Sequence, residues 1–443
     1  MLRAIQVSWL IASADQVIRD GVLVTDGGRI EQVTDKTGLE ELLRSGKLRR
    51  EDVQVKKGFL LSPCFVNAHS HQYGILSHGI PGGKGVVDFE TFLSKYWWPL
   101  IENRIRKEEV LTTCRTSMIR MLKSGVGCFC DILEAPLTEE GSLILQGEEI
   151  RKAGMKAIVG LESSERIDAV NGQRCLEENV NAVRHFRGDG QIRGSICTHT
   201  TFTCSPDFIR KAARMAQEED AMLQFHLSES RYEPDLLRKK SATEPAALYR
   251  QLGALRPGTL ATQCVKVSDE EINILKETGT GVVHMPISNC EVGGGVAPVP
   301  KMLKAKIPVA LGSDGYIDDF FEVCRAAFLI HKAYLESTEV MPSRTVFRMA
   351  TEYGARTLGM TDIGLLKAGN SADFFLCRMD QPTPVTEENI FDQFILHTKS
   401  ESVTDVFVGG RQLVEHGRCL TLDEDDCLEE MKDCADQFWK GVK

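Results

Sequence analysis

Eight short apolar runs alternate with helix-like segments between residues 58 and 360, and this rhythm limits the fold of the 443-residue chain more than any other feature. Apolar runs of this length are typical of buried strands, and strands that alternate with amphipathic helices favour βα units and a parallel sheet. Eight such units predict an α/β protein containing a (β/α)8 barrel. The runs begin at Gly58, Gly125, Met155, Gln191, Ala221, Gly258, Gly279 and Ile307.

The two ends of the chain have a different pattern, made of short strands and turns. Neither end alone has enough strands for a stable sheet. We therefore expect residues 1–57 and 363–443 to build one small composite β-sandwich beside a barrel formed by residues 58–362. Residues 423–442 are predicted to form a terminal helix, since acidic residues at its start and lysines at its end suit the helix dipole.

Charge and hydropathy exclude several classes of partner. The net charge is −10 and no long basic block occurs, which argues against a nucleic-acid partner. No window of 18 apolar residues exists, so no membrane span is predicted. The first residues lack the pattern of a signal peptide, and the 14 cysteines are then expected to stay reduced in a cytoplasmic protein.

The sequence Asn67-Ala68-His69-Ser70-His71 ends the first predicted barrel strand. Side chains two residues apart on a strand point the same way, so both imidazoles can reach one metal ion. Active sites of barrels lie at the carboxyl ends of the strands, which favours this interpretation over a polar loop.

His226 ends the fifth predicted strand, and Glu229 follows it; Asp314 ends the eighth. Singly, His226 could be a hydrogen-bonded strand-end residue and Asp314 a helix cap. Together with His69 and His71 they place three imidazoles and a carboxylate on one face of the barrel. That donor set suits Zn²⁺ or Fe²⁺ and leaves room for a water molecule.

Several of these segments resemble the amidohydrolase superfamily, in particular its branch of cytosine deaminases and atrazine or melamine hydrolases. The segments are DGVLVTDGGRIEQV, SPCFVNAHSH, THTTFTCSPDFI, FHLSES, VVHMPISN, ALGSDG and IGLLKAGNSADFFL. The resemblance covers nearly the whole chain and implies a barrel flanked by a composite sandwich.

The resemblance also implies roles for particular residues. It assigns His69, His71, His226 and Asp314 to the metal, and Glu229 to proton transfer with the substrate. His199 and His284 match positions near the substrate, although packing or supporting roles remain open for both.

One position departs from the family pattern. Deaminases of this type usually have His-Cys-Val at the end of strand six, whereas this chain has Gln263-Cys264-Val265. Glutamine can form hydrogen bonds but cannot carry a proton or a positive charge. We expect Gln263 to face the attacking water or the substrate; the alternative is a hydrogen bond to the barrel wall. Binuclear family members use a bridging Lys and a ligand from strand six, and neither strand four nor strand six of this chain has a Lys or His in the matching place. One metal is therefore predicted, with Zn²⁺ as the first choice and Fe²⁺ as the alternative.

Residues 72–100 form a long aromatic insert after the first barrel strand. Trp97 could stack on a planar substrate or could simply anchor the insert, and Tyr316 could reach the substrate or help to cap the next helix.

The predicted partner is a small molecule, and a homo-oligomer is left open.

These observations predict a metal-dependent hydrolase that acts on a C–N bond of a small cyclic or amidine-like compound. Hydrolytic deamination of an aminated heterocycle is the favoured reaction. Asp314 would accept the proton of the attacking water, and Glu229 would protonate a substrate nitrogen. The alternatives are hydrolysis of an amide or ring C–N bond, and a barrel that has lost catalysis and serves in binding or assembly.

Overall fold

Two parallel sheets lie at the centre of the computed structural model, which describes residues 2–315, 317–440 and 442. The first contains, in order, β6 (Phe65–Ser70), β7 (Val126–Leu133), β8 (Lys156–Leu161) and β9 (Ile192–Gly194). The second contains β10 (Ile196–Cys197), β11 (Leu223–Leu227), β12 (Thr259–Gln263), β13 (Gly281–His284) and β14 (Val309–Leu311). All paired neighbours run parallel, so the α/β prediction is confirmed.

The two sheets adjoin at both of their edges. Parallel bridges join Ser70 to Asp314 and Ser163 to Thr198. The run that begins at Gln191 is divided between the sheets, because β9 pairs with β8 and β10 pairs with β11. The first bridge holds the ends of β6 and β14 side by side, so residues far apart in the sequence share one site.

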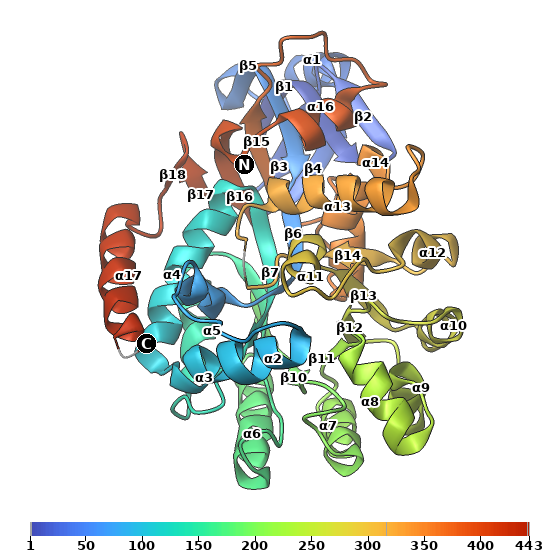
Figure 1. The fold of residues 1–443 in the computed structure, drawn as a ribbon. Coiled ribbons are helices and arrows are strands. Elements are labelled where there is room, and N and C mark those ends of the chain that lie inside the picture. The colour runs from blue at the N-terminus through green and yellow to red at the C-terminus, as the bar shows by residue number, and fades with distance from the viewer. Residues whose placement is uncertain (1, 316, 441, 443) are drawn as a thin grey trace.

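Helices follow the strands and surround them (Figure 1). Side chains cap two of these helices at their first turn: Ser205 accepts a hydrogen bond from the Phe208 amide, and Ser268 and Glu271 form a capping box. In chain order, the helices that follow the parallel strands are α4 (Lys107–Lys123), α5 (Ser142–Ala153), α6 (Ala169–His185), α7 (Pro206–Glu218), α8 (Tyr232–Ser241), α9 (Pro245–Gln251), α10 (Asp269–Thr278), α11 (Pro286–Glu291), α12 (Val299–Lys304), α13 (Phe320–Leu335), α14 (Ser343–Arg348) and α15 (Gly354–Thr357).

A third sheet combines both ends of the chain, in the order β18-β17-β16-β15-β5-β1-β3-β4, with β2 paired to β1. Hydrogen bonds join these strands into one nine-stranded sheet, where the sequence predicted a sandwich. Its strands are β1 (Leu2–Ser13), β2 (Gln16–Arg19), β3 (Val22–Asp26), β4 (Arg29–Thr34), β5 (Val53–Pro63), β15 (Phe374–Arg378), β16 (Val403–Val408), β17 (Arg411–Glu415) and β18 (Arg418–Cys419). The helices α1 (Lys36–Arg44) and α16 (Ile390–His397) belong to the same two end segments.

The apolar run that begins at Gly58 was predicted as one barrel strand, and the structure corrects this. Its first part lies in β5 of the third sheet, and only the part after Cys64 forms β6. Pro63 lies at the end of β5, and proline has no amide hydrogen with which to continue a strand ladder. The chain therefore changes sheets at this point.

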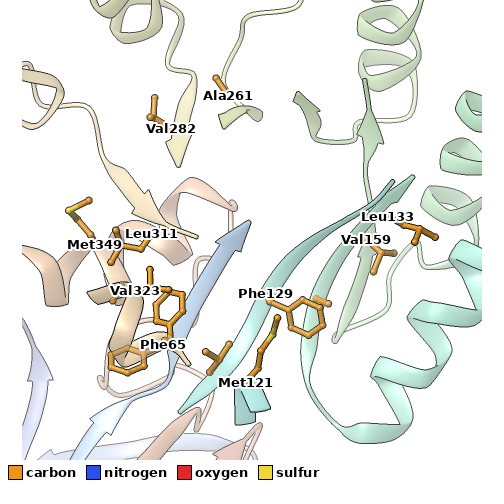
Figure 2. Packing of buried hydrophobic residues seen from close by; sticks show 14 of the residues in the cluster. Phe65, Met121, Phe129, Leu133, Val159, Ala261, Val282, Leu311, Val323 and Met349 are labelled. Atoms are coloured by element: carbon orange, nitrogen blue, oxygen red, sulfur yellow. The ribbon is translucent and has the colours of Figure 1, made fainter. Parts of the chain in front are cut away.

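Aromatic and ionic contacts connect the third sheet to the parallel strands. The Phe65 ring on β6 lies 5.2 Å from the Phe375 ring on β15, measured between centroids. The ammonium of Lys156, at the start of β8, lies 2.8 Å from a carboxylate oxygen of Asp373, and both side chains are buried. Figure 2 shows the apolar core around Phe65, with side chains from the neighbouring strands β7 and β8.

The insert between β6 and α4 contains a 3-10 turn at Gln72–Ser77, α2 (Phe89–Phe92), a π-helical turn at Leu93–Trp97, α3 (Trp98–Leu100) and a 3-10 turn at Glu102–Arg104. The last long helix, α17 (Glu424–Trp439), packs beside α4 (Figure 1).

The end of α17 contacts this insert. The Trp439 indole donates a 2.8 Å hydrogen bond to the Leu76 carbonyl, and the Arg104 guanidinium lies 4.5 Å from the centroid of the Phe438 ring. Within the described ranges, none of the helices is both long and apolar enough to cross a membrane.

Candidate metal centre

Three imidazoles predicted as metal ligands meet at the carboxyl ends of the strands. His69 lies on β6, His71 follows it, and His226 lies on β11; all three are buried. One ring nitrogen from each lies within 4.8 Å of the others. This spacing is compatible with one ion bound between them.

The hydrogen-bonding state of these rings fits a metal site. Neither ring nitrogen of His69 has a partner among the described residues, and Nδ1 of His226 also lacks one. Nδ1 of His71 lies 2.8 Å from the Ile132 carbonyl oxygen, an arrangement that orients the ring and leaves Nε2 available. Burial lowers the pKa of His69 and of His226, and the neighbouring imidazoles lower it further. Neutral, buried and unpartnered imidazoles have the chemistry of metal ligands.

Asp314 supplies the carboxylate predicted for this set. It follows β14 in a left-handed conformation, with φ of 63°. Its Oδ1 lies 3.6 Å from Nε2 of His71, and its Oδ2 lies 3.9 Å from Nε2 of His69. The four predicted ligands are therefore brought together, and three nitrogens with one oxygen suit Zn²⁺.

Gln263 reaches the same carboxylate from the end of β12. Its side-chain nitrogen donates a 2.7 Å hydrogen bond to Oδ2 of Asp314. Its side-chain oxygen accepts a hydrogen bond from the amide of Asn289 on α11, which fixes the orientation of the Gln263 amide. Gln263 thus lies at the candidate centre and not only against the wall of the sheet.

A small cavity of about 30 Å³ adjoins the centre. That volume holds about one water molecule, and a heterocycle does not fit without movement of the surrounding groups. The cavity is lined by His71, Phe89, Phe92, Leu93, Trp97, Glu102, Glu134, His199, His226, Glu229, Gln263, Ser288, Val292 and Asp314. Since Phe89, Phe92, Leu93 and Trp97 belong to the insert, the insert covers the site.

Glu229 lines the cavity, as a proton-transfer group must. Burial raises the pKa of its carboxyl group well above the usual range, and the charges of Asp314 and Glu233 raise it further. A raised pKa favours the protonated form of Glu229, which is the form that can deliver a proton to a substrate.

The predicted substrate residues divide into three groups. His199 and Trp97 line the cavity, and Nδ1 of His199 lies 2.8 Å from the Thr203 hydroxyl. His284, in contrast, points its Nε2 at Nε2 of His331 over 3.1 Å and does not line the cavity, so its part in substrate binding stays a prediction. Tyr316 lies outside the described residues.

Two of the carboxyl groups that line the cavity, those of Glu102 and Glu134, were not predicted. Glu134 directly follows β7, so the rule that singled out His226 and Asp314 could have found it. Glu102 lies in the insert, which has no regular pattern to indicate its position.

A second cavity, of about 760 Å³, lies at the opposite ends of the strands, beside Met222, Thr259 and Ile307. None of the predicted site residues in the described chain lines it.

Sequence comparison decides the family. The profile of the amidohydrolase family matches residues 60–413. The chain belongs to the amidohydrolase family. This confirms the resemblance found in the motifs, and it makes the chain a hydrolytic enzyme that acts on C–N bonds.

Several curated amidohydrolases are similar over almost their full length. A 5-methylthioadenosine/S-adenosylhomocysteine deaminase of Syntrophus aciditrophicus is 30% identical over 434 residues, covering 96% of this chain and 94% of the relative. A deaminase of the same name from Pelotomaculum thermopropionicum is 29% identical over 94% of this chain and 93% of its own length. A 5'-deoxyadenosine deaminase of Methanosarcina acetivorans is 28% identical over 95% of this chain and 94% of its own length.

Solved structures agree with the amidohydrolase fold. An adenosine deaminase from Xanthomonas campestris with bound zinc has a TM-score of 0.88 at 21% identity, covering 98% of both chains. An atrazine chlorohydrolase from Arthrobacter aurescens, complexed with zinc, has a TM-score of 0.84 at 19% identity, covering 98% of this chain and 99% of the other.

Proposed function

We propose that this amidohydrolase catalyses the hydrolytic deamination of an aminated heterocycle, with purine nucleosides as the first substrates to test. The observation that carries the proposal is the meeting of His69, His71, His226 and Asp314 beside the carboxyl group of Glu229. The deaminase names of the similar proteins support the choice of purine nucleosides.

The proposed site would hold one divalent metal ion, for which Zn²⁺ is the first choice. Its ligands would be His69, His71, His226 and Asp314. When bound by these residues, a divalent metal ion would lower the pKa of water from ~15.7 towards ~7 and would so supply hydroxide at neutral pH. We also infer that the two parallel sheets close into a single (β/α)8 barrel, because bridges join them at both edges.

The protein's own groups move the protons. Asp314 receives the proton of the attacking water, while the hydrogen bond from Gln263 holds its carboxylate in place. Glu229 gives its proton to a ring nitrogen of the substrate as the hydroxide adds to the neighbouring carbon. The proton held by Asp314 then passes to the exocyclic amine, the C–N bond breaks and ammonia leaves, and the hydroxyl proton on the attacked carbon returns to Glu229. The Trp97 ring lies against the cavity, where it can pack on a planar substrate.

A screen for ammonia release tests the proposal. The zinc-loaded protein is assayed with aminated purines and their nucleosides, pterins, pyrimidines and triazines. We expect turnover of at least one aminated purine compound. Cleavage of a ring or amide C–N bond without ammonia release from an exocyclic amine would assign the alternative hydrolase reaction. Metal bound in stoichiometric amount with no turnover of any class would contradict the proposal.

A further inference from the structure

Ser288 is a buried residue at the wall of the cavity whose hydroxyl group has no hydrogen-bond partner. It lies on α11, lines the cavity and is only 1% exposed. Its Oγ is buried and forms no hydrogen bond with any of the described residues. Burial of a hydroxyl group without a partner destabilises the folded state, so such groups are rare in native proteins. The Ser288 hydroxyl therefore indicates a partner that enters the cavity.

The usual local partner of a helical serine is not used. Serine hydroxyls on helices can bond the carbonyl group four residues earlier in the chain. For Ser288 that carbonyl belongs to His284, and it accepts a 3.0 Å hydrogen bond from the Gly312 amide. The Ser288 carbonyl accepts a 2.9 Å hydrogen bond from the Val292 amide. The backbone of this turn is therefore bonded, and the hydroxyl group is left over.

The helix α11 belongs to the wall of the cavity and not to the insert that covers it. Asn289, the next residue, donates a hydrogen bond to the side-chain oxygen of Gln263, and its carbonyl accepts a 3.1 Å hydrogen bond from the Gly295 amide. These bonds connect α11 to the end of β12. Movement of the insert that admits a heterocycle need not displace Ser288 from its place beside Gln263.

The other polar side chains of the cavity already have partners or roles. Those bonded to the protein are Trp97, Glu102, Glu134, His199 and Gln263. Those assigned to the proposed metal set or to proton transfer are His71, His226, Glu229 and Asp314. Among the described lining residues, Ser288 is thus the polar group that is left for the substrate.

The chemistry of an aminated heterocycle decides the direction of this hydrogen bond. In the proposed reaction Glu229 protonates the ring nitrogen beside the attacked carbon, and the exocyclic amine leaves. The polar atoms that remain at the edge of an adenine ring are N3 and N7, which carry no hydrogen and can only accept. A serine hydroxyl group can donate to such a nitrogen.

We infer that Ser288 binds the substrate: its hydroxyl group donates a hydrogen bond to a ring nitrogen other than the one that Glu229 protonates. The inference rests on the proposed deaminase function. It adds a substrate-binding residue and narrows the substrate class to rings with a further unprotonated nitrogen, which is N3 or N7 in a purine.

The experiment compares Ser288→Ala with the parent protein, both loaded with zinc. Calorimetric titration measures the affinity for adenosine, 3-deazaadenosine and 7-deazaadenosine, since each analogue lacks one candidate nitrogen. The titrations are made with Glu229→Gln as the parent, which slows turnover. The matched control is Tyr249→Phe, which removes another buried hydroxyl without a partner; the Tyr249 ring stacks on Phe225 and does not line the cavity. Thermal unfolding is followed without substrate.

We expect Ser288→Ala to weaken adenosine binding about 3- to 10-fold, the usual effect of one neutral hydrogen bond. It should leave the affinity for one of the two analogues nearly unchanged, because that analogue lacks the partner of the hydroxyl group. The substrate-free variant should unfold at the same or a higher temperature, since alanine removes a polar group that burial disfavours. Tyr249→Phe should behave likewise in unfolding but keep the parent affinities.

Unaltered affinity for adenosine in Ser288→Ala would overturn the inference. Equal losses for all three compounds would also overturn it, because the partner would then be neither N3 nor N7. A lower unfolding temperature with unaltered affinities would assign the hydroxyl group to the fold. If the alanine variant does not fold, Ser288→Cys carries the same test, since a thiol is a weaker donor of similar size.

Failure of the proposed function gives a different result. If the wild type binds adenosine but releases no ammonia, the deaminase proposal fails for this compound, while the titrations still test Ser288. If the zinc-loaded wild type does not bind adenosine, the inference is overturned for purines.

Discussion

The side-chain amide of Gln263 donates a hydrogen bond to Oδ2 of Asp314 over 2.7 Å, and Asn289 holds the same amide from its other side. The residue that departs from the usual family pattern thus contacts the carboxylate proposed to accept the proton of water. A neutral donor at this position keeps the carboxylate oriented without adding a titrating group to the site.

Gln263→Ala is expected to keep the metal bound but to lower turnover about 10- to 100-fold, since a buried partner loses its hydrogen bond at a cost of about 1–3 kcal/mol. Gln263→His should add a limb near pH 6.5 to the pH–rate profile, the ordinary pKa of an imidazole. Steady-state kinetics across pH and metal analysis check both variants. Unaltered kinetics in both would show that Gln263 only supports the wall of the site.

Replacing Glu229 by Gln should lower kcat by ~10²–10⁴-fold, the usual contribution of a general acid–base group, and should leave the metal content unchanged. The reason is that the amide cannot deliver a proton, whereas burial raises the pKa of the Glu229 carboxyl group and so favours its protonated form. Glu178→Gln, a buried carboxylate remote from the cavity, serves as the control. Nearly normal turnover of Glu229→Gln would assign the proton transfer to another group.

Protein purified without chelator should contain about one divalent metal per chain by elemental analysis. His69→Ala should abolish tight binding, because it removes a ligand that has no other partner in the described chain. His284→Gln changes a buried histidine that contacts His331 instead, and it should retain the metal. Two tightly held ions would contradict the mononuclear assignment, and retention of metal by His69→Ala would contradict the ligand set.

The buried pair of Lys156 and Asp373 should matter for stability. Lys156→Met leaves a buried carboxylate without its cation and should lower the free energy of unfolding by about 3–5 kcal/mol. Lys301→Met, which breaks the exposed pair with Asp269, should cost roughly 0–1 kcal/mol. Urea unfolding measures both. Equal effects would indicate that the pair between β8 and the third sheet contributes no more than a surface pair.

Acid should destabilise the fold through His331. Burial lowers the pKa of this imidazole to about 4, whereas the unfolded chain titrates near ~6.5. As the pH falls, His331 therefore takes up a proton in the unfolded state before it does so in the folded state. The contribution of His331 to the free energy of unfolding is complete above pH ~6.5 and is lost as the pH falls towards 4. In urea unfolding at several pH values, His331→Asn, which cannot titrate, should show a shallower loss over this window. An identical pH dependence would assign the loss to other groups.

The sequence was sufficient for those parts of the site that depend on strand ends. The predicted metal ligands lie at or just after the carboxyl ends of parallel strands; they are His69, His71, His226 and Asp314. Because these strand ends meet on one face, identifying the strands in the sequence was enough to predict that the four side chains lie close together. The contact between Gln263 and Asp314 needed more, because it depends on left-handed backbone at both residues that no periodic pattern reveals.

Other features could not be predicted for identifiable reasons. The apolar run after Gly58 is continuous in the sequence, yet it serves two sheets, because hydrophobic residues suit both and only Pro63 marks the break. Glu102 belongs to an insert of short irregular turns, where no periodicity indicates which side chain faces the cavity.

The contacts of α17 have a practical consequence for handling the enzyme. The Trp439 side chain is bonded to the Leu76 carbonyl, in the turn that begins right after His71, and Arg104, two residues beyond Glu102, rests on Phe438. A preparation cleaved by proteases within this helix would keep most of its mass and its circular dichroism. The insert around the cavity would nevertheless lose the contacts that Trp439 and Phe438 make with it. Intact-mass spectrometry of each batch should therefore precede any comparison of kinetic constants.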